Sequence, residues 1–172
     1  VETADDISGL TLRTTPNPAH IAAFQALGAN PTPMPFAELY TALETRTVDG
    51  QENPVSLIRS ANLYSVQDHL SLTAHAYTAA PLIMNKQKFD SLAPELQTLI
   101  KEEAREAARY QRQLNHDNEQ GDLAFLEEQG MQVVREPDTA SMRAKVAEPV
   151  RAEFTAKHGS ELLERIDAAL AH

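Results

Sequence analysis

Arg13 is the side chain best placed for binding chemistry, because it ends a segment that alternates apolar and polar residues like a β-strand. In open α/β sheets, ligands collect at the carboxyl ends of the strands. A guanidinium there can hold a carboxylate through two parallel hydrogen bonds. The alternative is a surface arginine in a salt bridge, and position alone leaves both open.

The run VDGQENP at residues 48–54 gathers amide and carboxylate side chains immediately before a predicted helix. Helix N-termini favour anions, so the amide of Asn53 is a candidate to help bind an anionic group. Capping of the helix by Asn53 alone is the simpler interpretation. Phe36 follows a proline-dense segment. It either lines a ligand cleft or packs in the core, and the core is the usual place for phenylalanine.

No combination of residues in the sequence indicates catalysis. The six histidines include no pair at the spacing of a zinc site, and His69 and His75 flank a predicted strand as structural residues. The chain has no cysteine, no phosphate-binding glycine loop and no Gly-x-Ser-x-Gly nucleophile elbow. We therefore expect a protein that is not an enzyme and that uses no metal and no cofactor in catalysis.

Composition narrows the class of protein further. Of the 172 residues, 42% are hydrophobic and 23% are charged, which is typical of a globular domain. The net charge of −10 repels phosphates and argues against a nucleic-acid partner. No stretch has the apolar length of a membrane span. The polar, acidic start shows no signal peptide, so we expect either a cytosolic protein or a natural N-terminus upstream of Val1.

Strand and helix patterns alternate along the chain, which favours an α/β layered fold with a mostly parallel sheet flanked by helices. Strand patterns cover residues 10–13, 70–74, 77–84 and 131–134. Helix patterns begin near Pro18, Phe36 and Pro54, run from Pro94 to Gln129, and fill the tail on both sides of Gly159. Pro149 should bend or shorten the first tail helix.

Two segments have unusual features. Residues 30–35 are too rich in proline for a helix or a central strand, so we expect a constrained loop there. The helix pattern at residues 94–129 is longer than a small domain needs, which suggests an element that lies across more than one lobe.

Three segments, in this order and spacing, resemble the solute-binding subunit of tripartite ATP-independent periplasmic (TRAP) transporters, the DctP family. They are GLTLR at residues 9–13, GANPTPMPFAELY at 28–40 and VDGQENP at 48–54. The resemblance covers essentially the whole chain. It implies a periplasmic-binding-protein-like fold in which two lobes close over a ligand.

The resemblance also implies roles for individual residues. Arg13 would hold the ligand carboxylate, Asn53 would assist it, and Phe36 would line the cleft. His75 and Tyr77 match the stretch where the chain crosses between lobes, and they would approach the ligand.

By the same resemblance, residues 1–78 and 119–172 form the second lobe, and residues 79–118 visit the first lobe. The rest of that first lobe and a signal peptide would precede Val1. We therefore expect the chain by itself to be oligomeric or held to a separate N-terminal piece.

The function implied is capture of a small organic acid in the periplasm and its delivery to the membrane permease subunits of the transporter. A ligand-sensing module of the same fold, acting in signalling, is the alternative. The sequence leaves open which acid is bound and whether a metal ion accompanies it.

Overall fold

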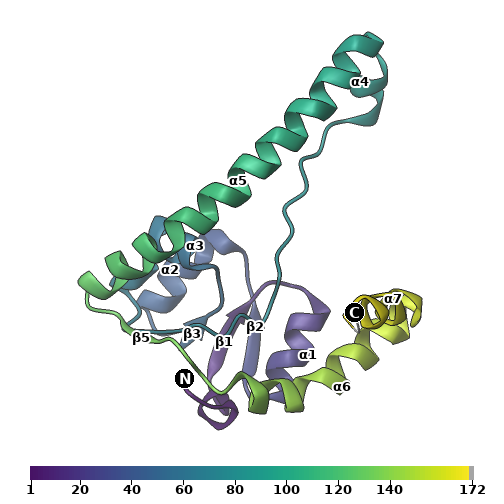
Figure 1. Cartoon of the computed structure of the whole chain (residues 1–172). Helices are drawn as coiled ribbons and strands as arrows, with labels where there is room; N and C mark the ends of the chain where they lie inside the picture. The colour runs from purple at the N-terminus through teal and green to yellow at the C-terminus, as the bar shows by residue number, and fades with distance from the viewer. Residues whose placement is uncertain (171–172) are drawn as a thin grey trace.

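The computed structural model describes residues 1–170 and has an α/β fold with parallel sheets and covering helices (Figure 1). The strands are β1 (Thr11–Thr14), β2 (Asn30–Pro33), β3 (Gly50–Gln51), β4 (His69–Ser71) and β5 (Gln132–Val134). The α-helices are α1 (Pro18–Ala26), α2 (Phe36–Glu44), α3 (Val55–Ser60), α4 (Lys86–Asp90), α5 (Pro94–Glu128), α6 (Thr139–His158) and α7 (Glu161–Leu170). Two 3-10 helices, η1 (Ala4–Ile7) and η2 (Leu63–Ser65), complete the elements.

The larger sheet has the strand order β2-β1-β3, and all of its pairs are parallel. Helices α1 and α2 connect its successive strands, as parallel pairing requires. A second sheet pairs β4 with β5, also in parallel, although the two strands lie far apart in the sequence. The predicted fold class is confirmed.

The proline-dense segment is a strand, so the prediction of a loop at residues 30–35 was wrong. β2 lies at the sheet edge and, among the strands of residues 1–170, pairs only with β1. Asn30 and Met34 donate their backbone N–H groups to the carbonyls of Leu10 and Thr14, at 2.8 and 3.3 Å. Since alternate residues of a strand face the same neighbour, the prolines at positions 31 and 33 direct their nitrogens away from β1. An edge strand tolerates proline there because no donor is lost from the ladder.

Two clusters of buried apolar side chains hold the fold together. The first joins α2, α3 and the C-terminal end of α5, and it contains Leu39, Leu63, Leu123 and Leu126 among others. The second joins η1, α1 and α6, and it contains Ile7, Phe24, Leu27 and Met142. The sheet is therefore covered by helices in the layered manner expected of α/β folds.

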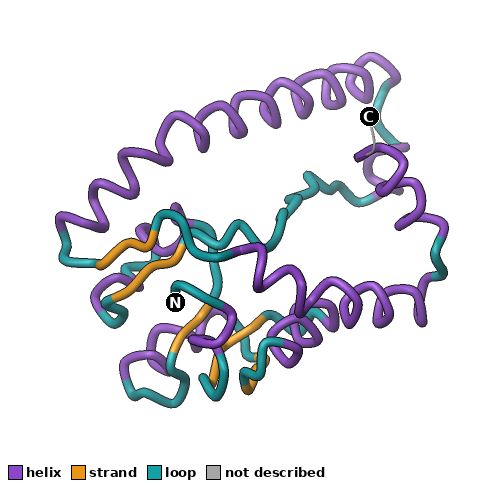
Figure 2. Tube along the Cα trace, turned by 60° about the horizontal axis from the view of Figure 1, so that its bottom comes forward, coloured by secondary structure: helices purple, strands orange, loops and turns teal. Residues whose placement is uncertain are grey.

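Helix α5 is the longest element, at 35 residues, and spans about 52 Å at the usual rise per residue. Its buried residues are Asp122, Leu123 and Leu126, all near its C-terminal end. The rest extends away from the sheets, with α4 at the far end, in both Figure 1 and Figure 2. The long helix predicted from residue 94 is confirmed.

Other elements depart from the predictions in detail. The strand expected at residues 77–84 is instead part of a segment without regular structure between β4 and α4. Helix α6 continues through Pro149 rather than ending there. Gly159, at a φ of +76°, separates α6 from α7 as expected. Among the described residues, none of the helices is both long enough and apolar enough to cross a membrane.

Candidate functional site

Arg13 lies on the central strand β1, and only 3% of its surface is exposed. Its Nε and Nη2 atoms donate hydrogen bonds to the carbonyl oxygen of Met34, at 3.1 and 2.9 Å. That carbonyl immediately follows the edge strand β2, so the sheet itself fixes the direction of the guanidinium. Phe36, at the start of α2, places its ring centroid 5.9 Å from Cζ of Arg13.

No ion pair of the described residues neutralises the charge of Arg13. Within residues 1–170, none of the ion pairs involves Arg13, so the interpretation as a salt-bridged surface arginine is wrong. A guanidinium has five N–H donors, and only two of those of Arg13 bind Met34. The remaining donors form a planar fork of the kind that binds carboxylates.

Asn53 follows β3 and does not cap the next helix, so the capping interpretation was wrong. Helix α3 begins at Val55, its N-cap residue is Pro54, and no side chain accepts a capping hydrogen bond. Instead, Nδ2 of Asn53 donates to Oε1 of Gln51, at 2.6 Å. Gln51 is the register partner of Arg13 in the sheet, so Asn53 is linked to the strand beside Arg13.

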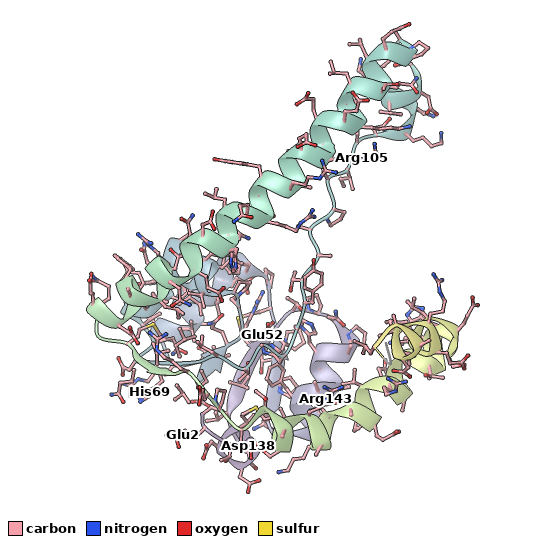
Figure 3. The ribbon with its side chains drawn as sticks, in the orientation of Figure 1. Glu2, Glu52, His69, Arg105, Asp138 and Arg143 are labelled. Atoms are coloured by element: carbon pink, nitrogen blue, oxygen red, sulfur yellow. The ribbon has the colours of Figure 1, made fainter. Side chains whose placement is uncertain are left out.

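Glu52, labelled in Figure 3, contacts two imidazoles at the same end of the sheet. Its Oε1 is 3.6 Å from Nδ1 of His20, and its Oε2 is 3.3 Å from Nε2 of His75. His75 also contacts the Thr73 hydroxyl through Nδ1, at 2.7 Å. The Glu52 side chain is only 15% exposed, so this carboxylate fixes the segment after β4 to the sheet.

The predicted site residues fall into two groups. Arg13, Phe36 and Asn53 come together at the carboxyl end of the larger sheet, from β1, α2 and the residue pair after β3. Phe36 is 44% exposed, so it is not the core phenylalanine of the alternative interpretation. His75 joins this end through Glu52, whereas Tyr77 is 90% exposed.

Sequence reasoning missed His20 and Glu52 as members of this cluster. His20 lies in the first turn of α1, shortly after Arg13, and Glu52 is the middle residue of the Gln-Glu-Asn run. Both residues follow parallel strands, and residues after such strands gather at one edge of the sheet, so the sequence could have indicated that both lie near Arg13. Their mutual distance was not readable, because 32 positions separate them along the chain.

Comparison with known proteins identifies relatives over nearly the whole chain. Residues 1–157 match the family model "Bacterial extracellular solute-binding protein, family 7", DctP. An uncharacterized Haemophilus influenzae protein is 51% identical over 95% of this chain and 50% of its own length. The 2,3-diketo-L-gulonate-binding periplasmic protein YiaO of Escherichia coli is 43% identical over 97% of this chain and 52% of its own length.

Solved structures of the same kind superpose closely. A TRAP periplasmic solute-binding protein from a Polaromonas species, bound to D-erythronate, is 40% identical with a TM-score of 0.92. That match covers 98% of this chain and 55% of the other chain. The chain thus spans about half the length of the proteins it matches. The family consists of solute-binding proteins, which are not enzymes, as the sequence analysis expected. The chain belongs to the DctP family of bacterial extracellular solute-binding proteins.

Proposed function

We propose that this protein binds a small organic acid in the periplasm and delivers it to the membrane permease subunits of a TRAP transporter. The observation that carries the proposal is the buried guanidinium of Arg13. It is held in a fixed direction by Met34, is flanked by the Phe36 ring, and has donors left for a carboxylate. The protein as a whole is acidic, so such a localised positive charge is needed to attract an anion.

The ligand class we propose is a sugar acid or a related hydroxylated carboxylate. YiaO binds 2,3-diketo-L-gulonate, and the Polaromonas protein contains D-erythronate. Two further relatives contain L-galactonate (Roseobacter denitrificans, 32% identical) and β-D-galacturonate (Sulfitobacter sp., 28% identical). Arg13 would take the carboxylate, and the amide of Asn53 would take a neighbouring oxygen. Phe36 would cover the carbon chain, and His75 and Tyr77 would approach from the segment after β4.

We propose that residues 1–78 and 119–172 form one lobe and that residues 79–118 belong spatially to another. Several apolar side chains of the intervening stretch support this division. Leu82 and Ile83 are 79% and 84% exposed, and Leu96 and Leu99 of α5 are each 48% exposed. Exposed apolar patches of this kind mark surfaces that bind other parts of a protein. A second lobe over this surface would close the ligand site and exclude water.

We favour a role in uptake over one in signalling, because a relative of this chain is part of a named transporter. The ectoine-binding protein of Halomonas elongata, 28% identical with a TM-score of 0.92, belongs to the TeaABC TRAP transporter. It and YiaO are periplasmic proteins, and we propose the same location here. The permease subunits would then be the partners that receive the ligand.

Substitution of Arg13 tests the proposed function. In the full-length natural protein, calorimetry would measure binding of D-erythronate, D-galacturonate and 2,3-diketo-L-gulonate. Arg13→Ala should weaken binding by about 30-fold or more, because removal of one partner of a buried charge pair costs about 2–5 kcal/mol. Arg13→Lys should not restore it, since an ammonium lacks the planar fork.

Arg143→Ala is the matched control, because Arg143 is exposed on α6 (Figure 3). It should bind like the unmutated protein. Equal affinity of Arg13→Ala and Arg143→Ala would refute Arg13 as the anchor. NMR of the recovered acids should show no chemical change, and product formation proportional to protein concentration would contradict a pure binding role.

A further inference from the structure

Gln51 is placed beside Arg13 by the shortest strand of the larger sheet. β3 consists of Gly50 and Gln51, and Gln51 is the register partner of Arg13. In-register neighbours of a parallel sheet direct their side chains to the same face. A Cβ at Gly50 would lie 3.1 Å from Cδ2 of Leu12, so the glycine allows β3 to approach β1 closely. The Gln51 amide therefore lies on the Arg13 face, next to the proposed anchor.

The Gln51 side chain is engaged with Asn53. The distance of 2.6 Å between Asn53 Nδ2 and Gln51 Oε1 is short for an amide hydrogen bond, and the contact is partly buried. In the part of the chain that the structure describes, Gln51 is the one side-chain partner of Asn53. Asn53 is free of the helix-capping role, because α3 begins without a side-chain cap. The Asn53 amide is thus held by Gln51 and keeps one N–H and its oxygen for another partner.

We propose that Gln51 is a positioning residue for ligand binding, which it serves by fixing the side-chain rotamer of Asn53 beside the Arg13 guanidinium. This inference rests on the proposed function. Without the Gln51 carbonyl, Asn53 would sample several rotamers in the free protein and would lose that freedom on binding. Ordering one side chain at a binding site weakens affinity by about 2- to 10-fold. Gln51 itself need not touch the ligand.

A double-mutant cycle tests this role in the full-length protein, with D-erythronate, D-galacturonate and 2,3-diketo-L-gulonate as probes. The variants are Gln51→Met, Asn53→Ala and the double variant. Gln51→Met keeps the length of the side chain but removes the acceptor, and it should weaken binding by about 2- to 10-fold. In the Asn53→Ala background the same change should have no further effect, because the residue through which Gln51 acts is gone.

Gln67→Met is the matched control. Gln67 also lies beside β3, but its Nε2 donates to the carbonyls of Asp49 and Val66 rather than to Asn53. Its affinity should equal that of the unmutated protein. If Gln51→Met weakens binding equally with and without Asn53, the positioning role is refuted while the proposed function stands. If, by contrast, Arg13→Ala leaves the affinity unchanged, the proposed function itself fails.

A measurement on the unmutated protein does not depend on how the variants fold. In NMR spectra without ligand, one of the two Asn53 side-chain amide protons should be shifted downfield and exchange slowly with water, because it is hydrogen-bonded to Gln51. Chemical shifts of both protons equal to those of asparagine in an unstructured peptide would overturn the inference. The expected pattern should disappear in Gln51→Met and persist in Gln67→Met.

Discussion

Arg13 and Thr14 are adjacent on β1, and both are buried polar residues whose hydrogen bonding differs. Arg13 binds the Met34 carbonyl, whereas Thr14 is fully buried and its Oγ1 has no hydrogen-bond partner among the described residues. An unpaired buried hydroxyl costs free energy that a methyl group of similar size would not. We therefore expect the Thr14 hydroxyl to lower the stability of the protein.

Thr14→Val should raise the free energy of unfolding by about 1 kcal/mol, because it removes an unpaired hydroxyl at nearly constant volume. Thermal or denaturant unfolding would measure the change. Thr15→Val is the control, since the Thr15 hydroxyl lies 3.3 Å from Nδ1 of His20. It should leave stability unchanged or lower it by up to about 1 kcal/mol. A destabilised Thr14→Val protein would show that the Thr14 hydroxyl is hydrogen-bonded in solution.

At the residue scale, the sequence identified candidate site residues at the ends of predicted strands. It did not identify the residues with which their side chains form hydrogen bonds. Arg13 could be predicted as a candidate because the alternating pattern of residues 10–13 indicates a strand that ends near it. The cap assigned to Asn53 failed because α3 begins at Val55, which makes Pro54 the N-cap residue, and local spacing does not fix the helix start to one residue. The contact between Glu52 and His75 depends on the path of the chain after β4, which only tertiary structure determines.

At the element scale, helix α5 is anchored by a partly buried ion pair. Nη1 of Arg59 on α3 lies 2.6 Å from Oδ1 of Asp122, and the two side chains are 44% and 12% exposed. The Arg59 guanidinium also lies over the Phe125 ring, with Cζ 4.4 Å from the centroid. These contacts fix the end of α5 that packs on the first apolar cluster.

Arg59→Ala should lower the free energy of unfolding by about 2–3 kcal/mol, because it leaves the Asp122 carboxylate buried without a counter-charge. Asp122→Ala should cost less, since Arg59 can turn toward solvent. Arg135→Ala is the control, because its pair with Glu127 is exposed on both sides and should contribute at most about 1 kcal/mol. Urea denaturation would rank the three variants. Equal losses for Arg59→Ala and Arg135→Ala would contradict the anchoring role.

Periodicity predicted the helices better than the strands. α5 was readable from its long helical pattern, and α1 from Asn17, whose Oδ1 accepts from the Ala19 N–H at 2.9 Å. β2 was not predicted because proline is excluded from central strands but tolerated in edge strands. The sequence alone does not show that this segment is an edge strand. Residues 77–84 have a strand composition but no neighbouring strand among the described residues, and a strand needs a partner to form its hydrogen bonds.

At the scale of the whole molecule, many large apolar side chains are left exposed on several elements. The exposed set includes Tyr77, Leu82, Ile83, Leu96, Leu99 and, on α7, Leu162 and Ile166. The sequence could indicate which of these side chains are apolar, but not that the layers of the fold leave them exposed. Since burial of apolar area is favourable by about 25 cal/mol per Å², these side chains should bind another protein surface.

The 172-residue chain, produced by itself, should therefore self-associate, and light scattering after size-exclusion chromatography would give its mass. A double change, Leu82→Ser with Ile83→Ser, should shift the equilibrium toward the monomer. It should not lower the melting temperature of the monomer, because both side chains are almost fully exposed. Lys88→Ser, at an exposed polar position on α4, is the control and should leave association unchanged. A monomer at all concentrations would contradict the proposal that residues 79–118 contact another lobe.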